Sequence, residues 1–72
     1  MNHKELDFTI FCIENIAERL EKNGAEIYSL LTKDSRILDD YIVPGCEALH
    51  TQGKEYIVND IIEYMKKEGI IQ

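Results

Sequence analysis

Two side chains in the second half of the sequence could do chemistry together: the thiol of Cys46 and the imidazole of His50. They are four residues apart, so on a helical turn they would lie on the same face. A cysteine and a histidine placed in this way can act as a nucleophile and its general base, or they can supply half of a zinc site. The spacing therefore raises two chemical hypotheses, and each of them requires further residues.

The residues that would complete either site are missing from the sequence pattern. Zinc usually takes three or four ligands, and the remaining candidates are His3 near the N-terminus and Cys12 in an earlier segment. A catalytic cysteine also needs an orienting third group and an oxyanion site, and no motif marks them. The glycines stand alone, and adjacent acids such as Asp39 and Asp40 are typical of a solvated surface. We therefore expect no catalytic residues, no metal ligands, no cofactor, and two reduced cysteines in the core.

A polar turn follows, inside the segment LHTQGKEYIVNDI. Thr51 is predicted to cap the last helix by accepting a backbone N–H bond. His50 would close the preceding turn, where a protonated imidazole is mildly favoured, and Gly53 would permit a sharp or close-packed backbone. These three residues are therefore interpreted as turn and capping residues, with a partner contact as the alternative.

The composition limits the class of protein. The chain has 72 residues, of which 44 % are apolar, and 14 acids against 8 bases give a net charge of −6. The length and the apolar fraction predict one globular domain over residues 1–72. The phosphate backbone of a nucleic acid would repel its negative charge, so nucleic acid is an unlikely partner. The longest apolar run has four residues, 10–13, whereas a membrane span needs about 20. The first residues carry charges of both signs, so we expect no signal peptide. We expect a cytoplasmic protein without a membrane segment.

The spacing of apolar residues predicts helices throughout. Asn23 and Glu26 form a capping-box pattern, Gly24 fits the left-handed position after the first helix, and Pro44 and Gly69 mark later helix ends. No segment alternates with period two, so the expected fold is all-α, a compact bundle of about four short helices with neighbours antiparallel. The expected helices cover residues 4–22, 24–33, about 36–43 and 52–68, with one more helical turn in CEALH. The predicted core comprises Ile13, Leu20, Leu30, Ile57, Ile61 and Tyr64.

The first helix is apolar on two sides. One stripe is expected to face the core, and Phe8 and Phe11 fall on the opposite side with Asn15 between them. Either other helices cover both sides, or Phe8, Phe11 and Asn15 form an exposed patch that binds a partner. We expect Phe11 to be buried and Phe8 to be the better candidate for a contact. The stripe assigned to the core comprises Leu6, Ile10, Ile13, Ala17 and Leu20.

FTIFCIENIAERL and LHTQGKEYIVNDI resemble the two ends of a family of short bacterial proteins that is described only as a domain of unknown function. The resemblance covers most of the chain, and the C-terminal part has an LHTQGxEYIVxDI-like signature. It implies a small cytoplasmic bacterial protein with no assigned activity. Some members are encoded beside proteins similar to toxin-type ADP-ribosyltransferases, which implies a partner-binding role like that of an antitoxin.

These observations together predict a small interaction module that is not an enzyme. It would associate with itself or bind a toxin-like protein encoded nearby. The alternative is a DNA-binding transcriptional regulator of the helix-turn-helix type, with RILDDYI as the recognition helix. Asp39 and Asp40 would then face the DNA, and its phosphates would repel them, so this alternative ranks second.

Overall fold

The computed structural model describes residues 2–71, and every regular element in that range is helical. In chain order these elements are α1 (His3–Leu20), α2 (Gly24–Thr32), the π-helical turn η1 (Leu38–Ile42), α3 (Cys46–Leu49) and α4 (Lys54–Lys67). The molecule measures 28 × 23 × 21 Å along its principal axes. The predicted all-α class is therefore confirmed. Within residues 2–71 no helix is long and apolar enough to cross a membrane.

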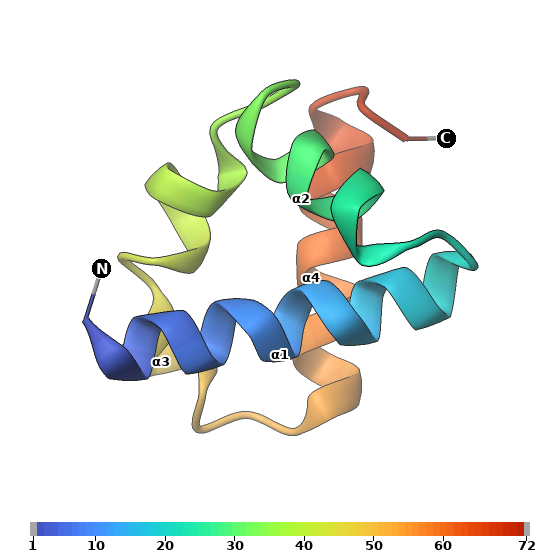
Figure 1. The fold of residues 1–72 in the computed structure, drawn as a ribbon. Coiled ribbons are helices and arrows are strands. Elements are labelled where there is room, and N and C mark those ends of the chain that lie inside the picture. The colour runs from blue at the N-terminus through green and yellow to red at the C-terminus, as the bar shows by residue number, and fades with distance from the viewer. Residues whose placement is uncertain (1, 72) are drawn as a thin grey trace.

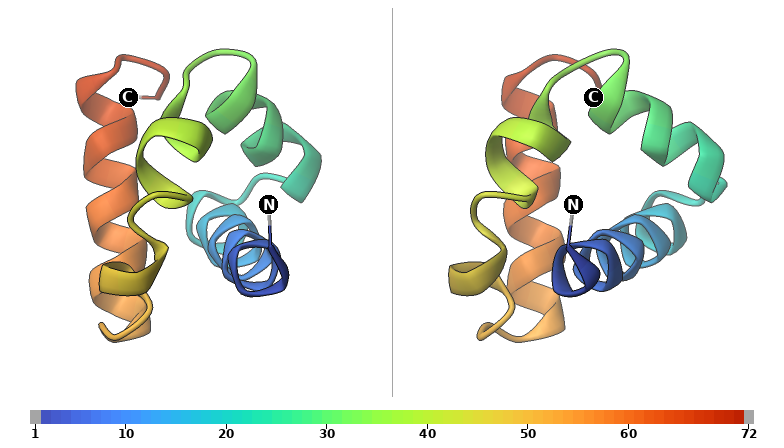
Figure 2. Two further views of the ribbon diagram at one scale, coloured as in Figure 1. Left: turned by 90° about the vertical axis from the view of Figure 1, so that its left-hand side faces the viewer. Right: turned by 60° about the vertical axis from the view of Figure 1, so that its left-hand side comes forward.

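The helices cross rather than form a regular antiparallel bundle. α1 runs across the lower half of the molecule, and α2 turns back above it (Figure 1). α4 stands upright and crosses α1 steeply, as the view along α1 shows (Figure 2). η1 and α3 connect α2 to the lower end of α4, where the last helix begins.

Local hydrogen bonds explain where the helices begin. The side chain of Asn2 accepts from the backbone N–H of Glu5 at 2.8 Å, and the Glu5 carboxylate accepts from the Asn2 N–H at 3.0 Å, so α1 begins with a capping box. Asn23 accepts from the backbone N–H of Glu26 at 2.8 Å, which confirms it as the cap of α2. The Glu26 carboxylate lies 3.9 Å from the Lys22 ammonium.

Helix ends agree less well with the sequence-based expectations. Glu21, with φ at 56°, takes the left-handed position after α1, whereas Gly24 is already the first residue of α2. The assignment of Gly24 was therefore wrong. Gly69 does adopt a left-handed φ of 74°, and the Ile70 N–H donates back to the Met65 carbonyl at 3.2 Å, as predicted for the end of α4.

The core lies where α1, α2, η1 and α4 meet. Ile57 and Ile61 are buried as predicted, but the other four members of the predicted core are half-buried and pack around it. The fully buried large side chains are Ile16, Ile27, Leu31, Ile37, Ile42, Ile61, Met65 and Cys12.

α1 turns part of the side that was assigned outward, including Phe8, towards the core, whereas Ala17 of the stripe assigned inward is buried as predicted. Phe8 is only 8 % exposed and Cys12 is completely buried, whereas Leu6 and Ile10 are each 46 % exposed. The inward assignment of Leu6 and Ile10 was therefore wrong. The N-terminal half of α1 is apolar on both sides, so its hydrophobic pattern does not determine which side packs inward. The positions of α2 and α4 determine it.

Candidate functional site

Cys46 and His50 do not form a reactive pair in this fold. Cys46 begins α3 and is buried, whereas His50 closes α3 and is exposed. Burial, as the main cause, raises the pKa of the Cys46 thiol, and burial with the charge of Cys46 raises that of Cys12 from 9.0 to about 12. Both cysteines are free thiols. Since the thiolate is the nucleophile and the metal ligand, these two groups are held in their unreactive form at neutral pH.

No metal site is apparent in the described part of the chain. Residues 2–71 contain no group of three or more histidine, cysteine, aspartate or glutamate side chains placed to hold an ion. A small polar recess of about 180 Å³ lies beside Cys46 and His50, where the start of α1 meets Pro44. Lys4, Glu5 and Glu47 also line it, and although the charge of Lys4 lowers the pKa of the Cys46 thiol, burial and the two carboxylates raise it.

The turn before α4 differs from the predicted turn. The Thr51 hydroxyl donates to the Ala48 carbonyl at 2.8 Å and does not cap α4. α4 begins only at Lys54, so its first free N–H groups lie beyond the reach of Thr51. The N-cap is Gly53, whose φ of −71° suits any residue and whose missing Cβ would meet nothing within 4 Å. The capping role of Thr51 and the close-packing role of Gly53 were therefore wrong, whereas His50 does close the preceding turn.

The predicted patch of Phe8, Phe11 and Asn15 is not an exposed aromatic surface. Phe8 lies in the core and stacks on the half-buried Phe11, with ring centroids 6.2 Å apart. The Asn15 amide donates to the Phe11 carbonyl at 2.7 Å, so this side chain is engaged within α1. The expected order is reversed: Phe8 is the more buried ring, because the side of α1 that carries it faces the core.

An exposed apolar surface lies instead on the other side of α1. Ile13 contacts the start of α2, with its Cγ2 atom 3.6 Å from where a Cβ of Gly24 would be. Leu6 and Ile10 continue this line towards the N-terminus, and Tyr28 follows Gly24 by one turn on α2. α2 turns back above α1 (Figure 1), and Leu6, Ile10 and Tyr28 are the exposed large apolar and aromatic side chains of these two helices. We call Leu6, Ile10 and Tyr28 the α1–α2 strip.

Acids border this strip. Asp7 and Glu14 lie on the outer side of α1 next to Ile10, and both are exposed. His3 lies 4.0 Å from the Asp7 carboxylate at the open end of the helix. The strip is absent from the sequence-based expectations, which place Leu6 and Ile10 in the core. The signal in the sequence was that the N-terminal half of α1 is apolar on both sides.

A second surface brings together residues that are distant in the sequence. The hydroxyl of Tyr41, from η1, donates to a carboxylate oxygen of Asp60 on α4. The ring of Tyr41 also packs on that of Tyr64, with centroids 4.7 Å apart and planes inclined by 42°. Tyr56 precedes Asp60 by one turn on the same face of α4. Sequence analysis did not pair these residues, because no local pattern links η1 to α4.

A groove of about 790 Å³ lies between the end of α1, α2 and the C-terminal segment. Its apolar floor includes Leu20, Leu30, Ile70 and Ile71, and Asp34 stands at its edge. Its titratable lining side chains are Lys22, Glu26 and Asp34, and Lys22 pairs with Glu26 at 3.9 Å.

Comparison with known proteins gives a family but no activity. The family model described as "Protein of unknown function (DUF3791)" matches residues 7–68, which is most of the chain. No curated protein and no solved structure matches the chain. The groove residues Ile70 and Ile71 lie beyond the matched range, whereas Ile10, Tyr28 and Asp60 lie within it. The chain therefore belongs to the DUF3791 family of proteins of unknown function.

Proposed function

We propose that this protein is a non-enzymatic interaction module that binds another protein through the α1–α2 strip. The observation that carries the proposal is the exposure of Leu6 and Ile10, two large aliphatic side chains one turn apart on an otherwise charged surface. Grouped apolar side chains rimmed by polar residues are typical of protein-binding surfaces. Tyr28, which is 51 % exposed, adds an aromatic group of the kind that dominates binding energy at interfaces.

The charges around the strip favour a different protein over a second copy as the partner. A symmetric dimer formed through this strip would bring Asp7 and Glu14 of one copy close to the same acids of the other. A partner with basic residues around an apolar segment would instead gain from these charges. The toxin-like enzyme that the family resemblance suggests is our first candidate, with self-association as an outcome of the test.

The DNA-binding alternative lacks a recognition helix. The segment that would enter the major groove forms η1, a π-helical turn of five residues. Asp39 and Asp40 are exposed on it, and Asp40 pairs with Arg36 at 3.4 Å. We therefore do not propose this function.

The double change Leu6→Ser with Ile10→Ser tests the proposal. Because both side chains are half exposed, the variant should fold and melt close to the wild type while losing its partner. Proteins captured from the native host with the tagged wild-type chain would be identified, and the binding of each would be remeasured with purified components.

A conservative pair, Leu6→Met with Ile10→Leu, is the matched control, since it keeps the apolar surface and should keep binding. Sedimentation of each variant reports self-association on the same samples. Unchanged binding and unchanged mass of the serine variant would refute the role of the strip.

A further inference from the structure

The tyrosine–aspartate cluster between η1 and α4 is a second surface with chemistry of its own. It comprises Tyr41, Tyr56, Asp60 and Tyr64, and it is independent of the α1–α2 strip. Tyr41 and Asp60 are both half-buried, so the polar centre of the cluster is partly shielded from water and still reachable from outside. Interactions with charged groups are stronger at such a position than on an open surface.

The two central polar side chains of this cluster, Tyr41 and Asp60, offer a ligand only hydrogen-bond acceptors. The hydroxyl proton of Tyr41 is engaged with Asp60 Oδ2. That hydrogen bond is the main cause, with burial and the carboxylate charge, that raises the pKa of Tyr41 to about 12, so the phenol keeps its proton at neutral pH. Asp60 Oδ1 has no hydrogen-bond partner among residues 2–71. A ligand must therefore donate hydrogen bonds, and a positive charge would complement the carboxylate.

The charge of Asp60 is not neutralised within the described chain. Other acids nearby in the fold have basic partners, such as Glu55 with Arg19 at 2.8 Å and Asp40 with Arg36 at 3.4 Å. Among residues 2–71, no lysine, arginine or histidine forms an ion pair with Asp60 within 4.0 Å.

Two neighbours on α4 set the local balance of charge. Glu63, three residues after Asp60, is also exposed and has no ion pair in the described chain. Lys67 lies on the same face but two turns away from Asp60. The cluster therefore presents negative charge to an incoming group.

An aromatic face lies directly beside this charge. Tyr56 is 56 % exposed, the most exposed of the large apolar and aromatic side chains in residues 2–71, and it lies one turn before Asp60 on α4. A planar cation lying on the Tyr56 ring could reach Asp60 with its N–H groups. Cation–π contacts of this type are stronger where water is partly excluded than at fully exposed sites.

We propose that Tyr41, Tyr56 and Asp60 form a binding site for an arginine side chain of a partner protein. The guanidinium is planar, is always charged, carries five N–H donors in a fixed fork and stacks on aromatic rings. It can contact Asp60 Oδ1 and the Tyr41 oxygen together while lying against Tyr56. A lysine ammonium is a compact, strongly hydrated charge that cannot use the ring and both acceptors equally well.

The site can be tested with short peptides on the intact chain. Acetyl-Gly-Arg-Gly-amide and acetyl-Gly-Lys-Gly-amide are titrated into the isotope-labelled protein, and backbone amide shifts are followed by NMR. The arginine peptide should give saturable shifts confined to residues 41, 56–60 and 64, and the lysine peptide should bind at least about threefold more weakly. Equal binding of the two peptides, absence of shifts, or shifts spread over all acidic surfaces would overturn the proposal.

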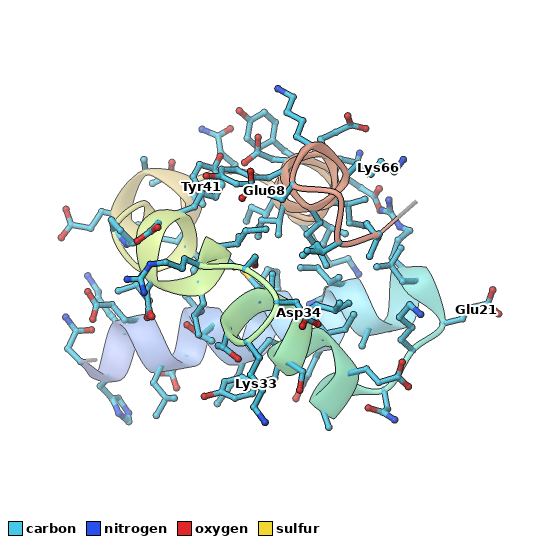
Figure 3. All side chains as sticks on the ribbon, turned by 90° about the horizontal axis from the view of Figure 1, so that it is seen from above. Glu21, Lys33, Asp34, Tyr41, Lys66 and Glu68 are labelled. Carbon is cyan, nitrogen blue, oxygen red and sulfur yellow. The ribbon has the colours of Figure 1, made fainter. Side chains whose placement is uncertain are left out.

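Three variants complete the test. Asp60→Asn removes the charge but keeps an oxygen that accepts from Tyr41, and Tyr56→Ala removes an exposed ring, so both should fold. Each of these two changes should weaken the binding of the arginine peptide by at least about threefold. Asp34→Asn is the control, because it also removes one carboxylate charge, but after the end of α2 and away from Tyr41 (Figure 3). This variant should bind the arginine peptide like the wild type. Binding unchanged by both site variants, or weakened equally by Asp34→Asn, refutes the site. Neither result depends on the α1–α2 strip.

Discussion

At the scale of single residues, burial and one long-range contact determine the behaviour of the polar groups. Arg19 donates to Asn59 at 2.6 Å and to Glu55 at 2.8 Å, and it thereby ties the end of α1 to the first turns of α4. This pair is exposed, so its contribution to stability is modest, about 0–1 kcal/mol. Buried groups such as Cys12 have larger consequences, because the core disfavours their charged forms.

The burial of the Cys12 thiol should make the folded protein less stable in alkaline solution. Its pKa is 9.0 in an unfolded chain and about 12 in the fold, so the folded state holds the proton more tightly. The stabilisation from this group is complete below pH 9 and is lost as the pH rises towards 12. Urea midpoints should therefore fall more between about pH 8 and about pH 10 in the wild type than in Cys12→Ala. An equal fall in both proteins would contradict this assignment.

At the scale of elements, close backbone packing fixes the connection from η1 to α3. The Gly45 N–H donates to the Tyr41 carbonyl at 2.9 Å, and a Cβ on Gly45 would lie 2.7 Å from that same oxygen. Such an approach is closer than a side chain tolerates, so only glycine allows the chain to turn here. This turn also helps to hold Tyr41 against α4, which links the packing of η1 to the proposed arginine site.

Gly45→Ala should therefore destabilise the protein by about 1–3 kcal/mol, because the backbone around Tyr41 would have to shift. Gly53→Ala is the matched control: its φ is negative and its Cβ would meet nothing within 4 Å. Gly53→Ala should be neutral or should stabilise the fold by up to about 1 kcal/mol, because alanine lowers the conformational entropy of the unfolded chain. Chemical denaturation of both variants checks the pair, and a neutral Gly45→Ala would show that the turn can relax.

At the scale of the whole molecule, the crossed arrangement of α1 and α4 places one apolar side of α1 in the core and leaves the other outside. Phe8 and Cys12 fill the interior, whereas Leu6 and Ile10 form part of the α1–α2 strip. A domain of 72 residues buries little surface, so a large side chain in its core accounts for much of its stability. The outer side contributes little to folding and is available for a partner.

Phe8→Ala should cost about 3–5 kcal/mol and could unfold the protein, because it removes a large ring from the core. Phe11→Ala should cost less, since Phe11 is half-buried and the ring of Phe8 remains in place. Thermal melting of the two single variants measures the difference. A greater loss for Phe11→Ala would mean that α1 is turned the other way.

The sequence alone determined the features that depend on near neighbours in the chain. Asn23 caps α2 through a residue three positions away, Gly69 ends α4 by its own φ, and the apolar seam around Ile57 and Ile61 requires only the period of one helix. The all-α class follows from such signals, and so does the expectation that the cysteines are buried and reduced.

Only the tertiary structure decided which side of α1 faces inward and which distant residues meet. Leu6 and Phe8 are equally suited to a core by composition, and the packing of α2 and α4 determined that Phe8 is inside. Tyr41 and Asp60 are 19 positions apart, and their hydrogen bond exists because η1 packs against α4. Both candidate binding surfaces depend on how the helices pack against one another. The hydrophobic pattern within one helix does not show which of its sides another helix covers, so the sequence could not predict either surface.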